Sequence, residues 1–132
     1  MINSETVDNM DADGKTLLYR ASEQNNEDVV AFLIKEQANV DKIDKKGIFP
    51  LLRAARFGFT EIVSMLLDAN AEVNRTRPDG VSALFLASQN GHEETVNLLI
   101  EAGANLNSIW NENGATPLYQ AIFLATLKLP KY

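Results

Sequence analysis

The sequence contains no cysteine, and it has a single histidine and a single tryptophan among its 132 residues. Without cysteine the chain cannot form a disulfide bond or a zinc site built on thiolates. No stretch approaches the roughly 18 apolar residues of a membrane-spanning helix, and residues 1–10 lack the apolar segment of a signal peptide. We therefore expect a soluble protein of the cytoplasm, with export into a host cell as the alternative.

The charge balance is acidic. Eighteen Asp and Glu residues against twelve Lys and Arg residues give a formal net charge of −6 at pH 7. General affinity for nucleic acid requires an excess of basic side chains that neutralise phosphates. We therefore expect no nucleic-acid partner, and the absence of a long apolar stretch predicts no membrane partner. The length fits one domain, and 45% hydrophobic residues are enough to bury a core.

No group of residues in the sequence indicates catalysis. A catalytic site needs a nucleophile with a base, paired acids, or converging metal ligands. We assign the single histidine, His92, to a turn, and we also place at turn positions three aspartates whose spacing does not match a calcium loop: Asp11, Asp13 and Asp44. No glycine-rich phosphate loop is present. We predict no enzymatic activity, no metal site and no cofactor.

The sequence does contain an internal repeat. Gly14, Gly47, Gly80 and Gly114 follow one another at a nearly constant interval of about 33 residues. Similar residues surround them, so that Asp13-Gly14-Lys15-Thr16 returns as Asp79-Gly80-Val81-Ser82 and as Asn113-Gly114-Ala115-Thr116. A repeat of this length is typical of a solenoid, in which each unit packs on its neighbours.

The sequence pattern of these repeats resembles that of the ankyrin repeat family. The matching segments fall in register and are Thr116-Pro117-Leu118-Tyr119, Ala54-Ala55, Gly91-His92-Glu93-Glu94, Val63-Ser64-Met65-Leu66-Leu67 and Gly103-Ala104-Asn105-Leu106-Asn107. The resemblance covers roughly residues 11–125 and implies an all-α solenoid of stacked helix-turn-helix units with projecting β-turn or hairpin fingers. We divide the chain into an N-terminal arm, residues 1–10, expected to be loosely packed, and an ankyrin repeat domain, residues 11–132. Its repeats span about 11–43, 44–76 and 77–110, with a partial repeat at 111–132.

Several positions depart from the family pattern. The family's histidine is replaced by Tyr19, Leu52, Phe85 and Tyr119, so we expect apolar packing in place of its hydrogen bonds. Asn25-Asn26 stands where Gly-His is usual, and asparagine accepts a positive φ better than most residues.

The sequence also indicates how the helices begin and pack. We predict that Thr16, Ser82 and Thr116 cap first helices, that Pro50 and Pro117 occupy first turns, and that Phe49 provides no cap. Alanines recur where neighbouring first helices should approach closely, at Ala21, Ala54, Ala55, Ala87 and Ala121. The second helices should bury one apolar face, formed by Val29, Val30, Leu33, Ile34, Ile62, Val63, Leu66, Leu67, Val96, Leu99 and Ile100.

Charge divides between two surfaces. We call residues 11–23, 41–56 and 73–90 the front, which the resemblance implies is concave, and residues 27–36, 60–72 and 93–101 the back. The back has nine acidic residues and one base, Lys35, whereas the front has nine bases and six acids. A solvated surface that simply carries charges is one interpretation of this difference. A front that attracts an acidic partner is the other.

The functional interpretation selects a set of contact residues. Large side chains stand at finger and first-helix positions that resemble the family's variable contact positions. Arginine, tryptophan and other aromatic side chains are enriched in interface hot spots. The candidate partner-binding residues are Lys45, Lys46, Ile48, Arg53, Arg56, Phe57, Arg77, Phe85, Gln89 and Trp110. For Trp110, packing under a finger is an equal alternative, whereas Phe59 is assigned to the core.

We predict a protein–protein interaction module whose partner has an acidic or mixed apolar–acidic patch. The alternative is a targeting or regulatory segment of a larger protein, such as a pathogen effector that acts in host cells. The apolar C-terminal stretch, residues 121–129, leaves two further interpretations open. Either the array is truncated and self-associates through its C-terminal end, or one long helix over residues 117–129 caps the third repeat.

Overall fold

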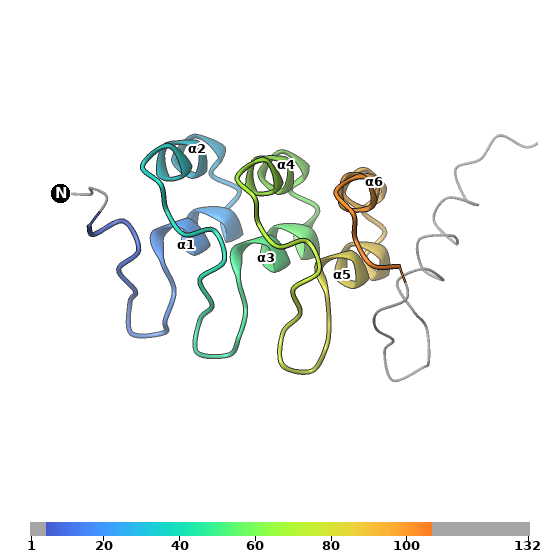
Figure 1. Cartoon of the computed structure of the whole chain (residues 1–132), viewed down its shortest axis with the longest axis horizontal. Coiled ribbons are helices and arrows are strands. Elements are labelled where there is room, and N and C mark those ends of the chain that lie inside the picture. The colour runs from blue at the N-terminus through green and yellow to red at the C-terminus, as the bar shows by residue number, and fades with distance from the viewer. Residues whose placement is uncertain (1–4, 107–132) are drawn as a thin grey trace, which may run out of the picture.

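The structure, a computed structural model, describes residues 5–106 as three helix pairs in a row (Figure 1). The pairs are α1 (Leu17–Glu23) with α2 (Glu27–Lys35), α3 (Pro50–Phe57) with α4 (Thr60–Asp68), and α5 (Ala83–Gln89) with α6 (Glu93–Glu101). Helices α1, α3 and α5 contact one another in order, and α2, α4 and α6 form a second row beside them. The described residues contain no strand, which confirms the all-α solenoid. The repeat boundaries stay predictions.

The loops before α1, α3 and α5 project on the same side of the row as fingers (Figure 1). In the first finger the Asp11 amide donates to the Lys15 carbonyl at 3.0 Å, and the Gly14 amide donates to the Asp11 carbonyl at 3.0 Å. The same two bonds recur at the equivalent positions of the second and third fingers. Gly14 has a φ of +80°, a conformation that strongly favours glycine. The repeated glycine of the sequence therefore marks the tip of each finger.

Helix starts follow the capping predictions. The Thr16 hydroxyl accepts a hydrogen bond from the Tyr19 amide, and Ser82 accepts one from Phe85, each at 3.1 Å. Phe49 gives no side-chain cap, and Pro50 occupies the first helical turn of α3. Asn25 has a φ of +57°, as the substitution for glycine predicted. Thr116 and Pro117 lie outside the described residues.

The core runs along the whole row and includes most of the predicted second-helix residues. Val30, Leu33 and Leu66 are fully buried, but Val29 is 39% exposed and Ile100 is 38% exposed. The prediction that these two side chains lie in the core is wrong. Ile62, which has the position of Val29 in the next repeat, is fully buried in α4, a helix that packs against both α2 and α6. The described chain has no helix pair before α2, so Val29 has no such neighbour.

The segment expected to be a loosely packed arm is joined to the first repeat. Val7 is only 1% exposed and belongs to the core. The Asp8 carboxylate accepts a hydrogen bond from the Asn39 amide at 2.7 Å. Asp41 and Asn74 make the same contact with the amides of Glu72 and Asn105, so the bond returns once in each repeat. The described part of the arm, residues 5–10, therefore packs as the end of a repeat unit does.

Small side chains lie where the first helices of neighbouring repeats pack against one another. Ala54, Ala55 and Ala87 are completely buried, and Ala21 is nearly so, which confirms the predicted close approach. Ala121 lies outside the described residues.

Replacing Ala54 with leucine is expected to lower the free energy of unfolding by about 1–3 kcal/mol, because the packed seam has no room for the added carbons. Ala31 in α2 is exposed and offers a matched control. The same change there is expected to alter stability by less than about 0.5 kcal/mol. Urea denaturation of both variants tests this, and equal stability of the two would place Ala54 outside the seam.

Candidate functional site

A pocket of about 190 Å³ lies on the front, between the second and third fingers. It is lined by Lys46 and Ile48 of the second finger, Arg77 of the third, and four helical residues, Leu52, Arg53, Arg56 and Leu86. Four of these seven side chains are cationic and none is acidic. The pocket therefore combines positive charge with an aliphatic wall.

Five of the residues predicted from sequence meet in this pocket: Lys46, Ile48, Arg53, Arg56 and Arg77. Two others are exposed nearby. Phe57, at the end of α3, is 44% exposed and stacks on Phe59 with 5.6 Å between ring centroids. Gln89 is exposed at the end of α5. Lys45 is exposed beside Lys46 but does not line the pocket.

The prediction that Phe85 contacts a partner is wrong, because its side chain is 2% exposed. Phe85 has the same register position as Leu52 in the second repeat and Tyr19 in the first, and all three are buried. The repeat register therefore held the signal that Phe85 belongs to the core. Trp110 lies outside the described residues. Leu52 and Leu86 also line the pocket but were not predicted from the sequence. Leu86 has the register position of the predicted contact residue Arg53, so the repeat register held a signal for it.

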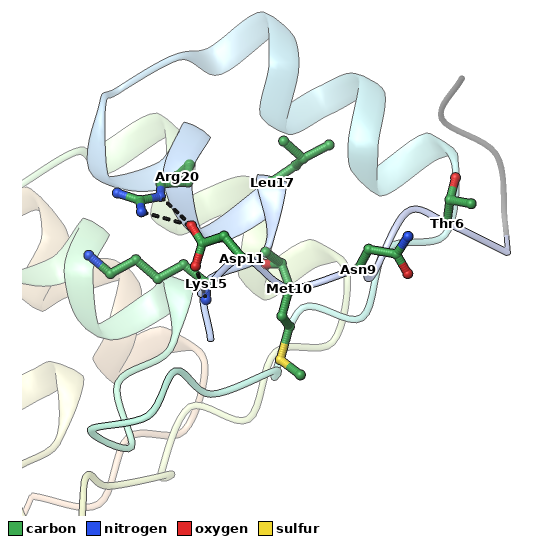
Figure 2. Close-up of a pocket in the computed structure, with 8 residues that line it drawn as sticks. Thr6, Asn9, Met10, Asp11, Lys15, Leu17 and Arg20 are labelled. Carbon is green, nitrogen blue, oxygen red and sulfur yellow. Dashed lines mark hydrogen bonds and ion pairs between the residues drawn. The ribbon is translucent and has the colours of Figure 1, made fainter. Parts of the chain in front are cut away.

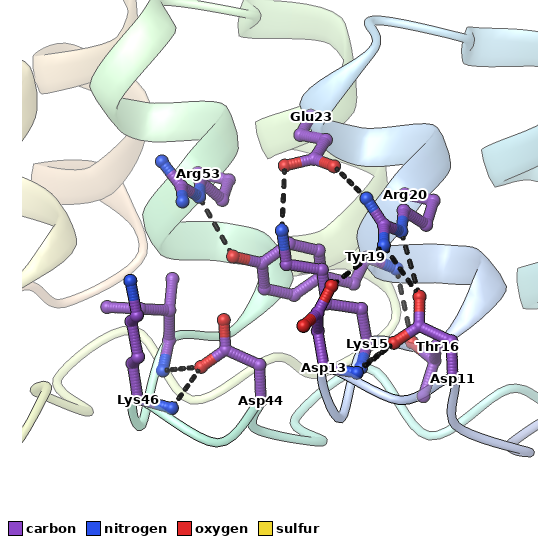
Figure 3. A network of polar contacts seen from close by, with 11 residues as sticks. Asp11, Asp13, Lys15, Thr16, Tyr19, Arg20, Glu23, Asp44, Lys46 and Arg53 are labelled. Carbon is purple, nitrogen blue, oxygen red and sulfur yellow. Dashed lines mark hydrogen bonds and ion pairs between the residues drawn. The ribbon is translucent and has the colours of Figure 1, made fainter.

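A polar network connects the first two repeats around Tyr19 (Figure 3). The Arg53 Nε donates to the Tyr19 hydroxyl at 2.9 Å, and the Lys15 ammonium lies 5.1 Å from the centre of the ring. Burial raises the pKa of Tyr19. Apolar packing does replace the family's histidine at Leu52 and Phe85, but Tyr19 keeps a hydrogen bond. This bond holds Arg53 at the edge of the pocket.

Asp44 fixes the second finger that carries Lys46. Its side chain is buried, and one carboxylate oxygen accepts hydrogen bonds from the Lys46 and Ile48 amides at 2.8 and 2.9 Å (Figure 3). The loop backbone therefore holds the positions from which Lys46 and Ile48 reach the pocket.

In the first repeat, carboxylates neutralise the arginine of the front, Arg20. Arg20 has the position in the first repeat that Arg53 has in the second. Its guanidinium contacts Asp11 at 2.7 Å (Figures 2 and 3) and Glu23 at 3.3 Å (Figure 3). The Lys15 amide and the Arg20 guanidinium lower the pKa of Asp11 from 3.8 to about 2. Asp11 lines a larger groove of about 480 Å³, together with Arg20 and Met10 (Figure 2). Unlike the pocket between the second and third fingers, this groove has an acidic residue in its lining.

Most cations of the pocket between the second and third fingers are not neutralised by carboxylates in this way. Within residues 5–106, Lys46, Arg53 and Arg56 form no ion pair with a carboxylate. Arg77 pairs with Asp79 at 2.7 Å and lowers the pKa of that carboxyl group. Three uncompensated charges therefore surround one small pocket, which creates a local attraction for anions on an acidic protein.

His92 has a structural position. Its ring nitrogen Nε2 lies 2.9 Å from the carbonyl oxygen of Arg56, so the imidazole donates a hydrogen bond from the third repeat to the second. His92 also lies at the start of α6, in the turn to which the sequence assigned it.

The back carries exposed acids on its three helices, among them Glu27, Asp28, Glu61, Asp68, Glu94 and Glu101. Within residues 5–106, no cluster of three or more His, Cys, Asp or Glu side chains has the arrangement of a metal site. No described helix combines the length and the hydropathy needed to cross a bilayer.

A family model for ankyrin repeats, in three copies, matches residues 1–77 and 51–129. The chain belongs to the ankyrin repeat family. Its helix pairs and fingers are ankyrin repeats, and ankyrin repeats are in general protein–protein interaction modules. A search of curated proteins gives no match from which a particular partner could be inferred.

Proposed function

We propose that this ankyrin repeat protein binds a partner protein through the front of its second and third repeats and has no catalytic activity of its own. The partner surface is acidic or mixed apolar and acidic. The observation that carries the proposal is the group of uncompensated cations, Lys46, Arg53 and Arg56, around one pocket. In the first repeat the equivalent arginine is already paired with carboxylates.

The surroundings of the pocket fit a protein interface. Exposed Phe57 offers an aromatic contact beside the exposed Arg56, whose guanidinium lies 5.5 Å from the centre of that ring. Arginine and aromatic side chains supply much of the energy at interface hot spots. The acidic back would repel an acidic partner, so electrostatics favours the front and one orientation of approach.

Changing Arg56 to glutamate together with Phe57 to alanine is expected to weaken partner binding at least about tenfold, because hot-spot residues typically contribute more than about 1 kcal/mol each. The loss arises from a slower association rate as well as faster dissociation, and it is larger at low salt than at high salt. Affinity capture with the wild-type chain, followed by binding kinetics on the captured protein, measures this.

The matched control reverses two charges on the back, with Glu61 and Glu94 changed to lysine. Both side chains are exposed, so the fold should tolerate the change. Binding within about threefold of wild type is expected, because charges far from an interface act on it only through long-range electrostatics, which salt screens. Loss of the partner in this control, with retention in the front variant, would place the interface on the back.

A further inference from the structure

We propose that the pocket between the second and third fingers receives one anionic side chain of the partner, together with the aliphatic carbons next to its charge. The charged group is a carboxylate or a phosphate. This inference rests on the proposed function and specifies one contact within it.

The size of the pocket favours a side chain over a whole small molecule. Small-molecule sites usually enclose about 300–1,000 Å³, whereas this pocket measures about 190 Å³. It is open on the front, between two fingers and two helices. A single side chain from a bound protein segment fits such a space.

The arginines are held in a way that leaves their outer nitrogens for an anion. Arg53 bonds to the Tyr19 hydroxyl through Nε, and Arg77 bonds to Asp79 through Nε. Within the described chain, neither residue has a further side-chain hydrogen bond. The terminal nitrogens of a guanidinium can hold a carboxylate or phosphate with two parallel bonds. Because the Nε contacts already restrict both side chains, less conformational entropy is lost on binding.

The apolar part of the pocket selects what lies next to the charge. Leu52, Leu86 and Ile48 line the pocket with aliphatic carbons. Leu52 and Leu86 are almost fully buried, so the partly exposed Ile48 offers most of the apolar surface that a bound side chain could touch. Leu86 occupies the register position that Arg20 and Arg53 fill in the earlier repeats. The third repeat thus has an aliphatic side chain where the others have a positive charge. An anion attached to a methylene chain matches this arrangement better than a bare ion.

Titration of the folded protein with acetate, butyrate and inorganic phosphate tests the inference directly. Side-chain NMR signals of Lys46, Arg53, Arg56 and Arg77 should shift together and saturate. Butyrate has two more methylenes than acetate and should bind about tenfold more tightly if both are buried. Saturation by phosphate alone would support the site with a phosphorylated side chain as its natural occupant. Shifts spread evenly over all surface lysines and arginines, without saturation, would overturn the inference.

Two matched variants locate the site. Lys46→Gln and its neighbour Lys45→Gln each remove one charge, but only Lys46 lines the pocket. Lys46→Gln should weaken phosphate binding about 3- to 10-fold because it removes a charge-assisted contact. Lys45→Gln should weaken it less than about twofold because that charge lies outside the pocket and solvent screens it. Equal losses would contradict the assignment.

Ile48→Thr tests the apolar wall separately. Ile48 is only partly buried and lies in a finger, so the fold should accept a smaller polar side chain there. The variant should bind acetate as wild type does but lose the tenfold preference for butyrate. An unchanged preference would show that the aliphatic wall makes no contact.

The experiments separate this inference from the proposed function. If the front variant loses the partner but no anion saturates the pocket, the interface stands and the subsite does not. If anions saturate the pocket while the partner binds the back, the proposed interface fails and the subsite stands as an anion site.

Discussion

Replacing Leu66 with alanine is expected to lower the free energy of unfolding by about 2–5 kcal/mol, the range for truncating a fully buried leucine. Leu66 has no exposed surface and lies in α4, the middle helix of the second row. Its loss leaves a cavity in the repeat that packs on both neighbours. Since repeat stability comes largely from such interfaces, the effect should reach the whole stack rather than one repeat.

The neighbouring Leu67 provides a matched control for this change. It is the same residue type in the same helix, but it is only partly buried. Leu67→Ala should therefore cost clearly less than Leu66→Ala in urea denaturation. Equal losses in the two variants would indicate that helix propensity, rather than burial, determines the result.

Replacing Gly58 with alanine is expected to cost about 1–3 kcal/mol from backbone strain alone, because Gly58 has a φ of +72° in the left-handed region. A second cost adds to this. A Cβ at this position would lie 2.5 Å from Nδ1 of His92, closer than any ordinary contact. The ring would have to move, which would disturb its hydrogen bond to the Arg56 carbonyl and so weaken the link between the second and third repeats.

Gly103 separates these two costs. Its φ is +93°, but no described atom lies within 4 Å of an added Cβ. Gly103→Ala should therefore show the strain without the clash and destabilise the protein less than Gly58→Ala in urea denaturation. If both substitutions had the same effect, the contact with His92 would contribute nothing.

The sequence was enough to predict the architecture because every turn of this fold repeats with a fixed interval. The glycine at each finger tip, the hydroxyl caps Thr16 and Ser82, and the small alanines between helices each satisfy a local backbone or packing requirement. Such requirements depend on a few adjacent residues. They can therefore be recognised without knowing which distant residues touch.

The site was harder to predict because it depends on contacts between repeats. Charge counting marked Arg20 and Arg53 alike, yet carboxylates of its own repeat neutralise Arg20, whereas a tyrosine of the preceding repeat holds Arg53. Phe85 is an aromatic residue of the kind common at interfaces, but its register position lies in the core and its side chain is buried. The Val7-Asp8 pair was overlooked because it stands apart from the glycine motif, although Val40-Asp41 and Val73-Asn74 repeat it.

The bonds from Asp8, Asp41 and Asn74 to the following repeats have a mechanical consequence. Each joins the end of one unit to the same place in the next, so a pull along the row loads these links in series. One link can then open while the others hold. Under tension the stack should therefore unfold one repeat at a time. When the tension is released, it should refold onto the repeats that are still folded.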